Sequence, residues 1–298
     1  MGYACLNITL KTVFRDLTLK TLEKLNTHQK IEKLNSIALI NTNQIEQILE
    51  FNHNNNIGLY RMPTNILPFP THPSAKEWNW REILLPCFQH IGKLSKEYNI
   101  QLSFHADEYT IINSINDIVL NNSFNTLLYL SDVLDSMNVE SKIIIHIGGV
   151  YGDKIASKKR FVKNFSKLPI AVRKKLVLEN DDKQYDWKDV LDISKEVQAP
   201  MVLDIHHYKI NNNHGPITSK DINEIFSTWK GITPKIHLSS PENTKDLKPH
   251  ADYINVEDFL WFYNTVKDFD YNIMLEAKAK ELAVLKFRDD LKILGINI

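Results

Sequence analysis

The stretch KIIIHI (residues 142–147) decides the fold, because it is a short, almost continuously apolar and β-branched run that ends beside a histidine. Such runs are typical of strands in a parallel sheet whose two faces are both covered. Seven further runs share the pattern: GYACL (2–6), IGLYR (57–61), IQLSFH (100–105), KLVLE (175–179), PMVLD (200–204), PKIHL (234–238) and NIMLE (272–276). Each of the eight predicts a buried strand.

Segments with a helical period separate these runs. In TNQIEQILEF (42–51) the apolar residues recur every three or four positions, and DWKDVLDISKEV (186–197) begins with Asp186 as a helix N-cap. Eight strand–helix units predict an α/β fold, a single (β/α)₈ TIM-barrel domain over residues 1–298. A doubly wound open sheet is the alternative, but its glycine-rich phosphate turn is missing after the first run, where the sequence is CLNITLKT.

Composition narrows the functional classes. The 298 residues are 43% hydrophobic and carry 36 basic and 36 acidic side chains, which excludes a disordered chain and a globally basic nucleic-acid binder. The two cysteines, Cys5 and Cys87, are too few for a disulfide framework. Apolar runs are too short for a membrane span, and the first residues, MGYACLNITL, lack the apolar core of a secretory signal. We therefore expect a cytoplasmic protein.

Metal-binding or phosphate-binding side chains end seven of the eight runs. They are Arg61, His105, His146, Glu179, Asp204 with His206 and His207, His237, and Glu276. In a barrel these carboxyl ends share one face, where such folds place their chemistry. Individually, His105 could be a structural histidine and each glutamate could pair with an arginine. Burying all of them together is costly without cations, so the set predicts a metal centre.

The donor types narrow the metal and the substrate. Imidazole and carboxylate ligands without a thiolate suit Zn²⁺, Mn²⁺ or Fe²⁺. Three carboxylates and several histidines exceed what one ion needs. Two or three divalent ions would leave the site positive and favour a phosphate, which points to metal-assisted hydrolysis of a phosphodiester.

Lys235 precedes His237 by two residues, so both side chains point to the same side of their strand. An inward lysine near metal ligands is useful if it is neutral, or if it is carboxylated into an anionic ligand. The alternative is a lysine that reaches the other end of the barrel. The sequence leaves both open.

Motifs along the chain resemble those of the UV damage endonucleases, relatives of the apurinic endonucleases. The motifs are GYACLN, YRMPTNILPFPTHP, SFHADEYT, IIIHIGGVYGDK, LVLEND, VLDIHH, PKIHLSS, PHADYI and IMLEAKAKE, over residues 2–281. The resemblance implies an ATP-independent repair enzyme that nicks damaged double-stranded DNA immediately 5′ to cyclobutane pyrimidine dimers and (6-4) photoproducts, often also abasic sites. Products would carry a 3′-hydroxyl and a 5′-phosphate, formed by metal-activated hydroxide.

The resemblance also implies a site with three Mn²⁺ ions, Zn²⁺ being the alternative, and a modified lysine at Lys235. Three residues would carry the catalysis: Lys235, His237 and Glu276. Strand alternation puts the side chains of Asp204 and His206 on the same side, whereas the family pattern selects His207 as the ligand. His250 is included among the ligands only because it lies in the HADYI motif. The implied ligands are His105, His146, Glu179, Asp204, His207, His237, His250 and Glu276.

Residues that would contact DNA or the lesion are also implied by position. They are Tyr3, Asn7, Arg61, Glu108, Tyr109 and Lys154. By default a first-strand tyrosine is a core residue, and the basic residues after residue 147 could form a solvated helix face. Glu108 stands where the family has a glutamine, a departure that bears on lesion preference.

We expect a monomer without a nucleotide cofactor or membrane contact, acting on DNA of the nucleoid. Three other functions stay open. They are an apurinic endonuclease on the same barrel, a sugar isomerase or epimerase with one or two ions, and a metal-stabilised scaffold without chemistry.

Overall fold

The computed structural model describes residues 1–266 and 269–296, and it contains a closed barrel of eight parallel strands in sequence order. The strands are β1 (Gly2–Ala4), β2 (Leu59–Met62), β3 (Gln101–His105), β4 (Lys142–His146), β5 (Leu176–Glu179), β6 (Met201–Asp204), β7 (Lys235–Leu238) and β8 (Asn272–Leu275). β1 pairs with both β2 and β8, which closes the ring. The predicted TIM barrel is confirmed, and all eight runs contain a strand. Residues 267–268 and 297–298 of the expected domain lie outside the described residues.

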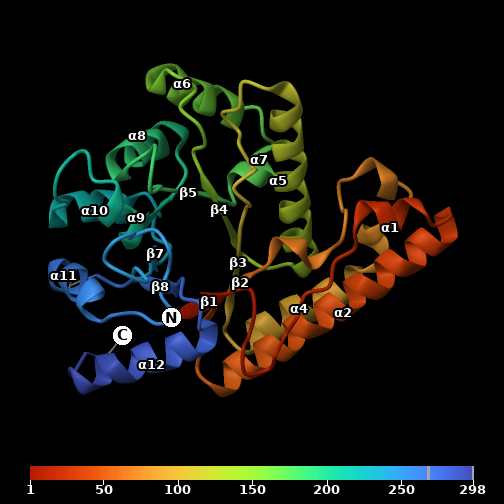
Figure 1. Ribbon diagram of the computed structural model, residues 1–298, viewed down its shortest axis with the longest axis horizontal. Helices are drawn as coiled ribbons and strands as arrows, with labels where there is room; N and C mark the ends of the chain where they lie inside the picture. Colours follow the sequence, from red (N-terminus) through yellow and green to blue (C-terminus); the bar gives the residue numbers. More distant parts are fainter. Residues whose placement is uncertain (267–268, 297–298) are drawn as a thin grey trace.

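Helices surround the strands on the outside of the barrel (Figure 1). Asp186 caps α8 as predicted, with its carboxylate accepting the N–H groups of Lys188 and Asp189, and the segment 42–51 lies within α2. Among the described residues, no helix is long and apolar enough to cross a bilayer. The helices are α1 (Leu19–Glu23), α2 (Thr27–Asn54), α3 (Trp80–Ile83), α4 (Leu85–Glu97), α5 (Asp117–Met137), α6 (Lys154–Phe165), α7 (Ile170–Arg173), α8 (Trp187–Val197), α9 (Ile205–Ile210), α10 (Ser219–Ser227), α11 (Glu257–Thr265) and α12 (Lys280–Ile293), with 3₁₀ turns η1 (Thr64–Ile66) and η2 (Pro73–Ala75).

Strand alternation separates an apolar layer from a polar layer inside the barrel. Ile144, Val177 and Val202 form a small buried cluster with Trp229. Each of the three strand residues precedes a polar residue by two positions, so the two side chains point the same way. The polar residues are His146, Glu179 and Asp204, at the carboxyl ends of β4, β5 and β6. The apolar layer therefore supports the polar site from below.

We predict that Gly92→Ala lowers the free energy of unfolding, because α4 passes very close to the end of α5. A Cβ at Gly92 would lie 1.8 Å from the carbonyl oxygen of Met137, a backbone atom that has no freedom to rotate away. Overpacking of this kind costs about 1–3 kcal/mol, which exceeds the roughly 1 kcal/mol that alanine gains over glycine within a helix.

Urea denaturation of both proteins checks this prediction. Gly58→Ala is the matched control, since the nearest atom to its Cβ would be Asn99 O at 3.9 Å. Equal stability of Gly92→Ala and the original chain would contradict the close approach of α4 and α5.

Candidate metal centre

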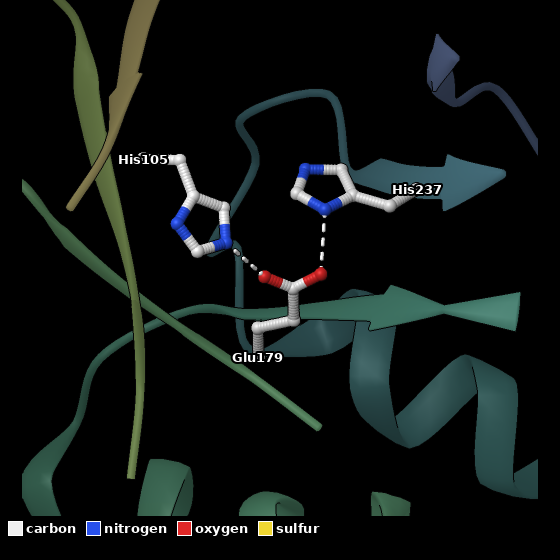
Figure 2. A group of neighbouring side chains, drawn as sticks. All are labelled: His105, Glu179 and His237. Carbon is white, nitrogen blue, oxygen red and sulfur yellow. Dashed lines mark hydrogen bonds and ion pairs between the residues drawn. The ribbon is translucent and has the colours of Figure 1, made fainter. Parts of the chain in front are cut away.

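The carboxylate of Glu179 lies at the centre of the polar layer and is fully buried. Its Oε2 is 2.6 Å from His105 Nε2, and its Oε1 is 2.6 Å from His237 Nδ1 (Figure 2). His146 approaches the same carboxylate, with 3.7 Å between its Nε2 and Oε2. One buried anion from β5 therefore gathers imidazoles from β3, β4 and β7.

Two further carboxylates join this group from β6 and β8. One potential ligand atom from each of Glu179, Asp204, His237 and Glu276 lies within 4.8 Å of the others. His237 Nδ1 is 3.2 Å from Glu276 Oε1, and Arg61 forms an ion pair with the same oxygen. The ends of strands far apart in sequence thus form one compact cluster.

His207 of α9 and His250 of the loop after β7 lie at the rim of this cluster. His207 and His250 line a cavity of about 810 Å³ together with His105, His146 and Glu276. His207 bonds Asn180 O through Nδ1 at 2.8 Å, so Nε2 is left available for a ligand. His206 is buried with its ring edge-on to His250 at 5.1 Å, and it is not part of the cavity lining. The geometry therefore favours His207 over His206 as a ligand.

Asn180 is a supporting residue that the sequence reasoning missed. Its side-chain amide bonds both the backbone N–H and the backbone C=O of Asp204, each at 2.9 Å. Its own carbonyl oxygen holds His207. Such outer partners fix the orientation of metal ligands. The sequence could have indicated Asn180, because it directly follows Glu179 at the end of a predicted strand.

The buried carboxylates of the cluster carry negative charge that must be compensated by positive charge. Burial opposes ionisation of Glu179, yet the neighbouring His237 and His105 hold its pKa well below the usual range. Burial also disfavours charge on His207, but the Asp204 carboxylate raises the His207 pKa to about 9. Glu179 likewise raises the pKa of His105 above its usual value, against the effect of burial. Protons on the histidines thus balance carboxylates that burial would otherwise leave uncompensated.

The donor set fits divalent ions. Among the described residues, no hydrogen-bond donor meets Asp204 Oδ2, and no partner meets His237 Nε2, although both atoms are buried. Both atoms are of types that bind divalent ions, so they are available as ligands. Carboxylate and imidazole without thiolate suit Mn²⁺ or Zn²⁺. All eight ligands expected from the sequence lie in the cluster or its cavity wall.

Lys235 lies apart from the ligands, in the layer below His237. It is buried, and it borders a cavity with Gln101, Lys142 and Trp229 at the amino ends of the strands. Burial, with a smaller effect of Arg61, lowers the pKa of Lys235 to about 8. This position matches the sequence alternative of a lysine directed towards the other end of the barrel.

Three of the residues expected to contact DNA lie at the cavity or beside it. Arg61 and Glu108 line the cavity, and Tyr109 next to Glu108 is 87% exposed. Tyr109 is accessible to a large substrate, whereas the Arg61 side chain is mostly buried and paired with Glu276.

The other three interact with side chains of the protein itself, two of them in its interior. The Tyr3 hydroxyl donates to Asn52 Oδ1, and the Asn7 amide donates to that hydroxyl, with both residues buried. Lys154 forms an ion pair with the buried Asp189. Tyr3 and Asn7 lie in the interior, as the default for a first-strand tyrosine suggests, and their contact with the lesion stays a prediction.

Known proteins resemble this chain over most of its length. A family model described as UV-endonuclease UvdE matches residues 1–297. The UV DNA damage endonuclease of Bacillus thuringiensis subsp. konkukian (strain 97-27) is 37% identical over 251 residues, covering 82% of this chain and 78% of that protein. A crystal structure of SacUVDE has a TM-score of 0.87 at 35% identity, covering 99% of each chain. Endonuclease IV from Thermus thermophilus is 13% identical with a TM-score of 0.58, covering 98% of this chain and 99% of that one, a likeness of fold alone.

We predict that divalent metal binds this cluster more tightly as the pH rises towards 9. His207 is protonated below its pKa of about 9 in the metal-free protein, and a ligand imidazole must be neutral. Losing one competing proton gives roughly a ten-fold gain in apparent affinity per pH unit between pH 7 and 8. Calorimetric titration in buffers of different ionisation enthalpy measures both the affinity and the released protons.

His207→Gln is the control for this titration. It should bind metal more weakly and release fewer protons over the same range. An affinity of the original chain that stays constant between pH 7 and 8 would contradict the assignment of His207.

Proposed function

Since the chain belongs to the UV-endonuclease UvdE family, we propose that it is a DNA repair endonuclease that nicks duplex DNA immediately 5′ to UV photoproducts. Its substrates would be cyclobutane pyrimidine dimers and (6-4) photoproducts, with abasic sites also accepted, and its products a 3′-hydroxyl and a 5′-phosphate. The proposal includes an ATP-independent monomer, acting as one domain on cytoplasmic DNA. The observation that carries it is the carboxylate–histidine cluster at the floor of a large cavity.

The cavity suits an extruded dinucleotide better than a small sugar. Its volume is about 810 Å³, and it is open to the surface on the side of the loops that follow the strands. Two covalently joined pyrimidines stack and pair poorly, so extruding them costs less than extruding intact bases. The adjacent phosphodiester would then lie over the cluster, with Arg61 at the cavity wall supplying positive charge.

The cluster would hold the catalytic metals, which we propose to be three Mn²⁺ ions with Zn²⁺ as the alternative. Bound ions of this kind supply Lewis acidity and lower the pKa of water. Glu179, Asp204 and His237 would fix the ions against the barrel floor, and Glu276 would bridge them to Arg61. The remaining histidines would complete the set: His105, His146, His207 and His250.

We also propose that Lys235 takes part after carboxylation, with its side chain turned from the cavity at the amino ends of the strands towards His237. Its pKa of about 8 makes the neutral amine accessible near neutral pH, and the amine nitrogen would add to CO₂ with loss of one proton to give a carbamate anion. Intact-protein mass spectrometry at mildly alkaline pH, compared with Lys235→Arg, tests this modification.

A nicking assay with three labelled duplexes tests the proposed function. We expect a metal-dependent cut immediately 5′ to a thymine dimer, no cut in the undamaged duplex, and loss of cutting with a chelator. Cutting of the abasic duplex alone would favour an apurinic endonuclease. No cutting of any duplex by the metal-loaded protein would reject the proposal and favour a sugar substrate.

Single substitutions in the cluster connect the cutting to these residues. Glu276→Ala and His237→Ala should each lower nicking by more than the roughly 10–100-fold that loss of an outer-shell partner costs. Binding to the dimer duplex should stay measurable, because neither change removes the cavity walls. Full nicking by both variants would show that the cluster is not the catalytic site.

A further inference from the structure

The segment between β1 and α1 forms an apolar wall of the metal cavity. Leu6, Val13 and Phe14 line the cavity from this segment, together with Arg61 and His105. Val13 is 66% exposed, so its side chain can be reached from the cavity that it lines. Residues 5–14 contain no carboxylate, and their one basic residue, Lys11, is exposed and does not line the cavity.

Buried Glu281 of α12 holds the first part of this segment. Its carboxylate accepts the backbone N–H groups of Ile8 at 2.9 Å and Thr9 at 2.7 Å, and also the Thr9 hydroxyl at 2.9 Å. The Asn7 side chain closes the adjoining turn by accepting the N–H of Leu10 at 2.8 Å. The loop is therefore tied to the barrel through its backbone, without burying its apolar side chains.

Two amide side chains of α2 hold the second part, which runs beside that helix (Figure 1). Gln44 accepts the N–H of Val13 and donates to its C=O, both at 2.6 Å. Asn41 does the same for Arg15, at 2.7 and 2.9 Å. The two side chains thus bond the backbone N–H and C=O of every second residue, Val13 and Arg15, as a neighbouring strand does in a β-sheet. The backbone of Val13 is thus fixed while its side chain stays exposed at the cavity.

We propose that this wall is a specificity element that packs against the bases of an extruded pyrimidine pair, with Val13 as its contact residue. The inference rests on the proposed function and adds the part of the lesion that is recognised. The wall is continuous with the metal cavity and uncharged next to it, so it suits the flat faces and methyl groups of pyrimidines rather than phosphates. A rigid apolar surface binds without an ordering cost. An abasic site offers no base to this wall.

Equilibrium binding to two non-cleavable duplexes tests the proposal. One carries a thymine dimer and the other an abasic site, and each has a methylene phosphonate in place of the bond 5′ to the lesion, so the metal-loaded protein binds without cutting. Val13→Ser should weaken binding of the dimer duplex about ten-fold, the size expected for loss of one buried apolar side chain. Binding of the abasic duplex should change less than about two-fold.

Ile170→Ser is the matched control. Ile170 is a β-branched residue with 61% exposure in α7, and it borders a cavity with Lys142 at the amino end of β4. It should leave both affinities unchanged. Equal weakening of both duplexes by Val13→Ser, or no weakening of either, would overturn the proposal. In a further outcome, the protein cuts no duplex in the nicking assay while Val13→Ser still weakens binding of the dimer duplex alone. That outcome would support the wall as a recognition element and reject the proposed hydrolysis.

Gln44→Ala tests the rigidity of the wall separately. It removes both bonds to Val13, so amide hydrogen exchange at Val13 should become faster and the dimer duplex should bind more weakly. Faster exchange with unchanged affinity would show that the fixed backbone is not needed for recognition.

Discussion

The buried carboxylate of Glu179 is the group on which the catalytic end of the barrel depends. A fully buried anion is costly unless charges compensate it, and here His105 and His237 bind its two oxygens while His146 lies nearby. Asp204 and Glu276 add two more carboxylates to the same space. These carboxylates raise the pKa of His105 and His207. In the part of the chain that the structure describes, Asp204 Oδ2 and His237 Nε2 of the same cluster are buried without a hydrogen-bond partner. Divalent ions would satisfy these requirements together.

The barrel makes such a cluster possible because it brings distant strand ends to one face while packing its interior below them. Ile144, Val177 and Val202 fill the layer beneath the ligands. The loops then add what strands cannot supply. Asn180 orients Asp204 and His207, and the segment after β1 is fixed by Glu281 and Gln44. In the proposed function, the strand ends would carry the chemistry and the tethered loops the recognition.

The strands and most of the cluster could be predicted from the sequence, because both follow local patterns. Apolar β-branched runs define the strands, and a polar residue closing each run defines a candidate ligand. Contacts that join distant segments could not be predicted this way. Tyr3 and Asn7 bond inside the protein, and Lys154 pairs with Asp189, since side chains elsewhere in the chain complete their hydrogen bonds or charges. The choice between His206 and His207 likewise needed the turn into α9.

The metal content of the purified protein tests the central claim most directly. The account predicts three divalent ions per chain by elemental mass spectrometry, and fewer in Glu179→Gln, in which the neutral amide replaces the shared anion. Circular dichroism would establish that this variant keeps the fold. Metal-free protein that takes up no Mn²⁺ or Zn²⁺ on titration would contradict the account.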